Sequence, residues 1–180
     1  MLRLSIEQVN AILAHLVSEA PNEACGLIAG KGSTTSRIIP VKNAAPNPQS
    51  HYRMDSADLL RAYKSIEAEG LDCIAVYHSH PKSEPLPSQE DIREAESNTS
   101  SLIHLIISLK PPQARLQAWH IQIGQVDEVE LLIGSEESEN VPKLSQMQIG
   151  SIILATLFAV LLLLAISFSL LPPAPPIPTP

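Results

Sequence analysis

The sequence predicts an α/β or α+β domain, with a mixed β-sheet and helices packed on it. Short apolar runs rich in β-branched residues alternate with segments whose apolar residues recur at helical spacing. Glycine and proline mark the boundaries between these segments. All of the 12 Lys and Arg and the 19 Asp and Glu side chains lie within residues 1–143, where they give the charge content of an ordinary folded domain.

The first predicted element is a helix that begins after Ser5 and ends near Glu19, before Pro21. Ser5 and Gln8 have the spacing of a capping box, and no uninterrupted apolar stretch of a secretory signal precedes them. A second helix ends at Gly70, a typical helix C-cap, and Gly124 marks a hairpin turn. Strands are expected at 24–29, 37–41, 71–78, 102–109, 114–123 and 126–133, and the later helices at 56–69 and 88–97.

Composition excludes several classes of protein. The formal net charge of −7 argues against nucleic-acid binding, which needs a basic surface. Cys25 and Cys73 are too few for a secreted disulfide scaffold, so we expect a reducing compartment. A domain of about 140 residues can bury a core without disulfides.

The C-terminal part of the chain carries no charge after Lys143. Residues 149–171 are long enough for a transmembrane helix, with a buried core helix as the alternative. We expect a domain at 1–135, an acidic Ser-rich linker at 136–148 and a proline-rich tail at 172–180. The position of Lys143 predicts a single-pass, tail-anchored membrane protein with its domain in the cytoplasm.

The segment from Tyr77 to Asp91 contains the residues with the clearest chemistry. His78 and His80 are two apart at the end of a predicted strand, so their imidazoles project from the same face. A proline-rich loop then leads to Asp91 in the first turn of the next helix. Two His and one carboxylate can hold zinc and leave a fourth position for water, as in catalytic sites. A further carboxylate would have to accept and donate the proton.

Each of these residues has a plainer interpretation. An isolated pair of His on a strand is more often found at the surface or in the core, and Ser88 with Asp91 also has the spacing of a capping box. The joint pattern H-x-H-x7-S-x2-D arises by chance in roughly one chain in two thousand, which favours a site. Cys25 and Cys73 are expected to be small buried residues. The other histidines lack a motif and are interpreted as structural or surface residues: His15, His51, His104 and His120.

This pattern resembles the signature of the JAMM, or MPN-plus, zinc metallopeptidases. That signature is a Glu on an early strand followed by H-[ST]-H-P-x6-S-x2-D, and residues 1–135 match it at every position. The resemblance implies a mixed sheet flanked by helices, similar to cytidine deaminases, although the paired cysteines of the deaminases are absent. The chain resembles a compact, prokaryotic-type member of the family to which a C-terminal transmembrane helix is added.

The resemblance also implies a role for each site residue. His78, His80 and Asp91 would bind one Zn²⁺ per chain, and Ser88 would help to hold the oxyanion of the intermediate. Glu23 would take the proton of the zinc-bound water and pass it to the leaving amine. Spacing alone does not select Glu23, because Glu19, Glu84 and Glu90 compete with it on sequence grounds.

The function implied by the resemblance is that of a zinc-dependent peptidase or isopeptidase. It would cut after the C-terminal Gly-Gly of a ubiquitin-like or sulfur-carrier protein, because the chain is too short for the insertions of polyubiquitin-specific members. The alternative is a catalytically silent, membrane-anchored binding scaffold with the proline tail as a docking ligand. A purely structural zinc site would need a fourth protein ligand, and none has suitable spacing.

Overall fold

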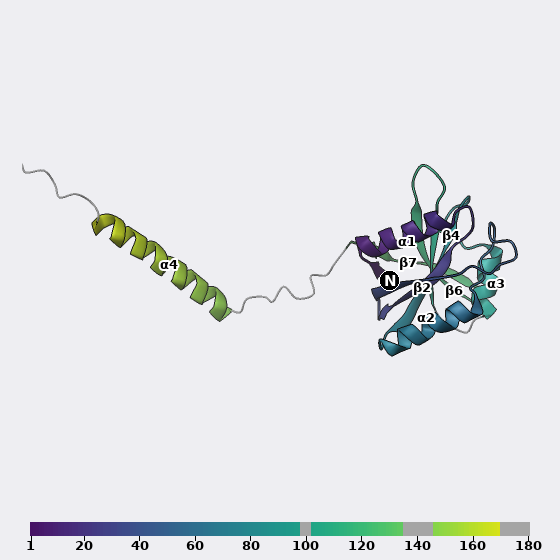
Figure 1. Ribbon diagram of the computed structural model, residues 1–180, viewed down its shortest axis with the longest axis horizontal. Coiled ribbons are helices and arrows are strands. Elements are labelled where there is room, and N and C mark those ends of the chain that lie inside the picture. Colours follow the sequence, from purple (N-terminus) through teal and green to yellow (C-terminus); the bar gives the residue numbers. More distant parts are fainter. Residues whose placement is uncertain (98–101, 135–145, 170–180) are drawn as a thin grey trace, which may run out of the picture. The chain divides into compact units, whose positions relative to one another are not determined.

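The computed structural model describes residues 1–97, 102–134 and 146–169 (Figure 1). The chain divides into two compact units, Met1–Glu136 and Glu137–Pro180. Among its described residues, the first unit contains three helices and one eight-stranded sheet of order β7-β6-β5-β4-β2-β3-β1-β8. Its helices are α1 (Ile6–Glu19), α2 (Ser56–Ala68) and α3 (Gln89–Ser97). Its strands are β1 (Leu2–Leu4), β2 (Cys25–Lys31), β3 (Thr34–Val41), β4 (Asp72–His80), β5 (Ile103–Ser108), β6 (Arg115–Gln122), β7 (Gln125–Val129) and β8 (Leu131–Ile133).

The sheet is mixed, and its two faces bury different cores. Three of its strand pairs are parallel, β4 with β5 and β1 with both β3 and β8. Helix α1 supplies Ile12 and Leu16 to one core, and α2 supplies Ala62 and Ile66 to the other. Figure 1 shows α1 and α2 on opposite sides of the strands. The predicted mixed sheet flanked by helices is therefore confirmed.

Strands β2 and β4 lie side by side at the centre of the sheet, and β4 carries His78 and His80 at its end. They are antiparallel, with Cys25 opposite His78 and Gly26 opposite Tyr77. A Cβ atom on Gly26 would lie 2.5 Å from the Ile39 carbonyl oxygen and from the Tyr77 ring, so glycine allows this close approach. The Tyr77 hydroxyl contacts His15 Nδ1 at 3.0 Å, in agreement with a structural role for that histidine.

Two features of the sheet differ from the sequence prediction. Strand β1 was not expected, because three residues are too few to show an alternating pattern. The single strand expected at 126–133 is divided at Glu130 into β7 and β8, which are the two outermost strands of the sheet. Only Glu130 separates β7 from β8. The sheet must therefore curve so that its two outermost strands come together at this residue. That curvature arises from the packing of the whole sheet, so local alternation could not show it.

The second unit corrects the prediction of a membrane anchor. Its helix α4 spans Gln146–Ser169. Within the residues that the structure describes, no helix is both long and apolar enough to cross a membrane. The predicted tail-anchored membrane location, which depends on a transmembrane helix at 149–171, is therefore wrong, and the predicted membrane partnership has no support in the structure. The prediction relied on 23 residues without charge that are rich in Leu, Ile, Ala and Val.

Parts of the predicted C-terminal organisation cannot be compared with the structure. The proline-rich tail at 172–180 and most of the linker predicted at 136–148 lie outside the described residues.

Candidate metal centre

Strand β4 ends with the two histidines of the motif. His78 is completely buried and His80 is 6% exposed. The strand continues to His80 because Ser79 bonds to the segment before β2. Its backbone N–H donates to the Ala24 carbonyl at 2.9 Å, and its Oγ accepts from the Ala24 N–H at 2.9 Å. Both imidazoles therefore project from one face of a well-anchored strand end.

Helix α3 places the carboxylate. Ser88 and Asp91 form a reciprocal pair, in which the Ser88 N–H donates to Asp91 Oδ2 at 2.6 Å and the Asp91 N–H donates to Ser88 Oγ at 3.1 Å. This is the capping-box geometry, with Asp91 in the place of the usual Glu. The sequence left open whether these residues cap the helix or serve a site. In the structure the cap fixes the position from which Asp91 reaches the histidines.

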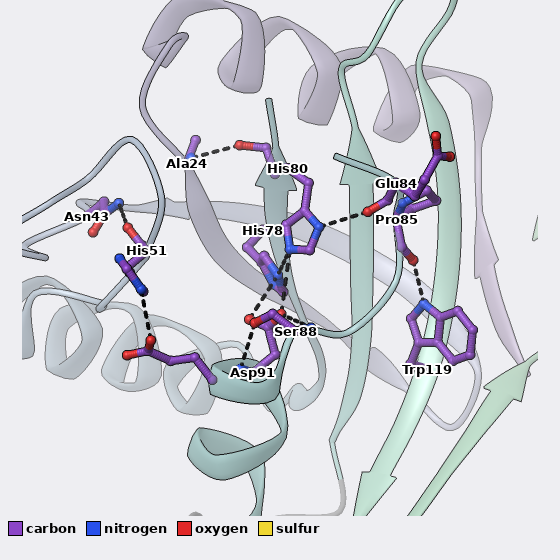
Figure 2. Close-up of polar contacts among 12 residues, drawn as sticks. Ala24, Asn43, His51, His78, His80, Glu84, Pro85, Ser88, Asp91 and Trp119 are labelled. Carbon is purple, nitrogen blue, oxygen red and sulfur yellow. Dashed lines mark hydrogen bonds and ion pairs between the residues drawn. The ribbon is translucent and has the colours of Figure 1, made fainter. Parts of the chain in front are cut away.

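The three side chains converge on one point (Figure 2). His78 Nε2 and His80 Nε2 lie 3.1 Å apart. Asp91 Oδ1 lies 3.3 Å from His78 Nε2, and Asp91 Oδ2 lies 3.5 Å from His80 Nε2. These buried ligand atoms form a group that could hold a metal ion.

The spacing of the three groups fits a zinc ion. Tetrahedral zinc has bonds of about 2.0–2.1 Å to nitrogen and oxygen, which gives edges of about 3.3–3.4 Å between ligand atoms. The two edges that start at His78 Nε2, 3.1 Å to His80 Nε2 and 3.3 Å to Asp91 Oδ1, lie close to this value. Two imidazoles and one carboxylate are also a donor set that suits zinc and leaves one position for water. The residues present therefore fit the metal that the family resemblance implies.

The electrostatics of the cluster favour a cation at its centre. Burial lowers the pKa of His78, although Asp91 opposes this shift, so the neutral imidazole that binds metals is favoured. Burial opposes ionisation of Asp91, but the bonds to the two imidazoles hold the pKa of its carboxyl well below its usual range. The carboxylate is therefore charged and available as a ligand.

The proline-rich loop between β4 and α3 is fixed by side chains of β5 and β6. His80 Nδ1 lies 2.9 Å from the Glu84 carbonyl oxygen, which can only accept, so Nδ1 donates and Nε2 keeps its lone pair for a metal. Trp119 Nε1 donates to the Pro85 carbonyl at 2.8 Å (Figure 2), and Ser108 Oγ donates to the Ser83 carbonyl at 2.6 Å. These bonds hold the second imidazole at a fixed angle.

Glu23 lies beside the cluster. The exchange of hydrogen bonds between Ala24 and Ser79 continues the β2–β4 register, which places Glu23 opposite His80. Glu23 is 8% exposed and lines a cavity of about 390 Å³ together with Pro81. Burial raises the pKa of its carboxyl to about 7, with His80 acting in the opposite direction. A carboxyl with this pKa can both accept and return a proton near neutral pH.

The competing glutamates have other partners or positions. The Glu84 carboxylate pairs with Lys110 at 3.1 Å and with Arg115. Glu90 pairs with His51 at 2.9 Å, and Glu19 lies exposed at the end of α1. Of the four candidate glutamates, Glu23 is the one that is buried and lies next to the cluster.

Cys25 shares a face of the sheet with His78 but does not join the cluster. Burial raises the pKa of its thiol to about 12, and the neutral thiol donates to the Val41 carbonyl. It is a small buried residue, as the sequence predicted.

The structure also shows neighbours that sequence reasoning missed. Tyr52 stacks on the ring of His78, and Asn43 Nδ2 donates to the Glu23 carbonyl at 2.7 Å. Both belong to the irregular segment between β3 and α2, where no periodicity or motif could have revealed them.

Comparison with known families adds the deciding observation. A family model described as prokaryotic homologues of the JAB domain matches residues 6–122. This chain belongs to the prokaryotic JAB family. The match includes both histidines, Ser88, Asp91 and Glu23, and it confirms the resemblance to JAMM proteins at the level of the domain family.

Two named relatives of this prokaryotic JAB protein are a protease and a peptidase. The chain is 50% identical over 82 residues to a probable TtuB-protein conjugate cleaving protease of Thermus thermophilus, a match that spans 46% of this chain and 55% of the relative. It is 33% identical over 130 residues to the CysO-cysteine peptidase of Mycobacterium tuberculosis, covering 71% of this chain and 88% of the peptidase. A solution structure from Desulfitobacterium hafniense matches with a TM-score of 0.68 and 34% identity, over 78% of this chain and 97% of that one.

Proposed function

We propose that this prokaryotic JAB protein is a zinc-dependent peptidase or isopeptidase. The observation that carries the proposal is the convergence of His78, His80 and Asp91 on one point, with Glu23 beside them. A metal-binding site with three protein ligands and a nearby carboxylate of raised pKa is an arrangement suited to metal-assisted hydrolysis of an amide.

Glu23 acts as the proton carrier in this proposal. Zinc bound to the three ligands would supply a water of lowered pKa and would polarise the scissile carbonyl. Glu23 accepts the proton of the attacking water and returns it to the nitrogen of the leaving amine. Its burial keeps its pKa close to that required for both transfers. Its backbone is held on both sides, by Pro48 at its N–H and by Asn43 at its carbonyl.

Ser88 assists the oxyanion of the tetrahedral intermediate. Its Oγ accepts the Asp91 N–H, which holds the oxygen in place. Its hydroxyl proton bonds to the Asp91 carboxylate and can rotate to donate to a substrate oxygen. Figure 2 shows Ser88 next to Asp91 and the two imidazoles. A donor that is fixed before the substrate arrives stabilises developing charge without reorganisation.

The relatives and the lining of the site support a proposal for the substrate class. The names of the Thermus and Mycobacterium relatives describe cleavage of a TtuB-protein conjugate and of a CysO-cysteine linkage. The cavity beside Glu23 is also lined by Asn47, Gln49 and Ser83, and it can receive an extended chain end. We therefore propose cleavage after the C-terminal Gly-Gly of a ubiquitin-like or sulfur-carrier protein.

Cleavage of such a protein tests this function. The zinc-loaded full chain should release the extension from a ubiquitin-like protein whose Gly-Gly terminus is prolonged by a short peptide or by a single amino acid. Mass spectrometry should show a product that ends at Gly-Gly, and prior removal of zinc with a chelator should abolish it. A fully zinc-loaded protein that leaves a panel of ubiquitin-like and sulfur-carrier fusions intact would contradict the proposed activity.

A further inference from the structure

The two histidines of the cluster are held in different ways. His80 is fixed by the bond from its Nδ1 to the Glu84 carbonyl oxygen. His78 is completely buried, yet its Nδ1 has no hydrogen-bond partner among the described residues. A metal-binding histidine nearly always donates its second N–H to a carbonyl, carboxylate or water, because this bond sets the tautomer and the angle of the ring. The orientation of His78 therefore needs another explanation.

An aromatic ring occupies the face of His78. The rings of Tyr52 and His78 are stacked, with centroids 4.3 Å apart and planes inclined by 21°. By contrast, the rings of His78 and His80 are inclined by 53° at 5.0 Å. A stacked ring at this distance restricts rotation of the imidazole about its χ2 angle, since any large rotation would drive the imidazole edge into the tyrosine.

The segment that carries Tyr52 is itself well anchored. It joins β3 to α2, and its two ends meet at the Asn43–Met54 bridge. The Asn43 side chain donates to the Glu23 carbonyl at 2.7 Å. It also donates to the His51 carbonyl at 3.0 Å (Figure 2). Asp55 then caps α2 through the Ala57 and Asp58 N–H groups. The position of the Tyr52 ring is thus set by the fold.

The same segment reaches the other parts of the metal centre. The Pro48 carbonyl accepts the Glu23 N–H at 2.6 Å, and His51 pairs with Glu90 in the first turn of α3. The segment from Asn43 to Asp55 therefore contacts Glu23, the end of β4 and the helix that carries Asp91.

We propose that Tyr52 is the positioning residue for His78. Its ring holds the imidazole so that Nε2 faces His80 and Asp91, the task that the Glu84 carbonyl performs for His80. This inference rests on the proposed metal site. It assigns the orientation of one metal ligand to ring stacking in place of a hydrogen bond.

Zinc affinity in the full chain tests this role through two substitutions at one position. Tyr52→Leu removes the ring but keeps an apolar side chain, and it should weaken zinc binding by about 10–100-fold, the usual effect of losing a group that orients a metal ligand. Tyr52→Phe keeps the ring and should bind zinc with the affinity of the wild type. Tyr63→Leu is the matched control, because Tyr63 lines the same cavity as Tyr52 but lies on α2. Affinity is measured by competition with a chromogenic chelator.

Two further measurements separate positioning from general stability. The cobalt-substituted Tyr52→Leu variant should have altered visible absorption bands, while Tyr52→Phe should not. In the wild-type protein, NMR should show that the His78 ring protons are shifted upfield by the stacked Tyr52 ring. This measurement needs no variant, so it can be made even if Tyr52→Leu fails to fold.

The inference is wrong if a folded Tyr52→Leu variant binds zinc as the wild type does, or if the His78 ring protons show no upfield shift. It is also wrong if Tyr52→Phe loses as much affinity as Tyr52→Leu. A wrong assignment of the metal ligands would give a different result, because zinc binding would then survive in the His78→Ala variant.

Discussion

Substitution of His78 by alanine should abolish stoichiometric zinc binding. His78 supplies one of the three ligand atoms, and its Nε2 lies within 3.1–3.3 Å of the other two. Loss of a group that only orients a ligand costs about 10–100-fold in affinity, so loss of the ligand itself should cost more than about 100-fold. Elemental analysis of purified full-length protein should fall from about one zinc per chain to near none.

The matched control is His120→Ala. His120 lies on β6 and belongs to no ligand group, so its removal should leave the zinc content unchanged. The thermal unfolding of both variants without zinc shows whether each is folded. A folded His78→Ala protein with a full complement of zinc would rule out the proposed ligands.

Substitution of Glu23 by glutamine should abolish cleavage while leaving zinc bound. Glutamine has nearly the same shape but cannot accept a proton from water, and loss of a general acid–base group costs about 10²–10⁴-fold in rate. Glu23 is not a member of the ligand cluster, so the metal content should remain at that of the wild type. The rate is measured with the Gly-Gly fusion protein, and the zinc content on the same sample.

Glu19→Gln is the appropriate control for this substitution. Glu19 was an equal candidate on sequence grounds, but it is exposed at the end of α1. Its variant should cleave at the rate of the wild type. Undiminished cleavage by Glu23→Gln, or an equal loss in both variants, would remove Glu23 from the mechanism.

The ligand cluster was accessible from sequence because each of its parts depends on local geometry. Residues two positions apart on a strand share a face, so His78 and His80 could be paired without knowledge of the fold. Ser88 and Asp91 have the three-residue spacing of a helix cap. The meeting of the strand end with the helix start is not local, but the short proline-rich loop between them allowed few other arrangements.

Glu23 and Tyr52 depend on contacts between distant parts of the chain. Glu23 lies beside the cluster because of the β2–β4 register, which at this end of the strands pairs residues more than fifty positions apart, such as Cys25 and His78. Periodicity within one segment contains no information on that register, so the family resemblance alone had favoured Glu23. Tyr52 lies in an irregular segment, where ring stacking on His78 depends on the Asn43 bonds and the α2 cap.

X-ray absorption at the zinc edge tests the metal centre most directly. We expect a first coordination shell of two imidazole nitrogens and two oxygens, one from Asp91 and one from water, at about 2.0–2.1 Å. The imidazole signal should fall when His80 is replaced by alanine in the same full-length protein. A sulfur shell at about 2.3 Å, or four protein ligands with no water, would contradict an open catalytic site.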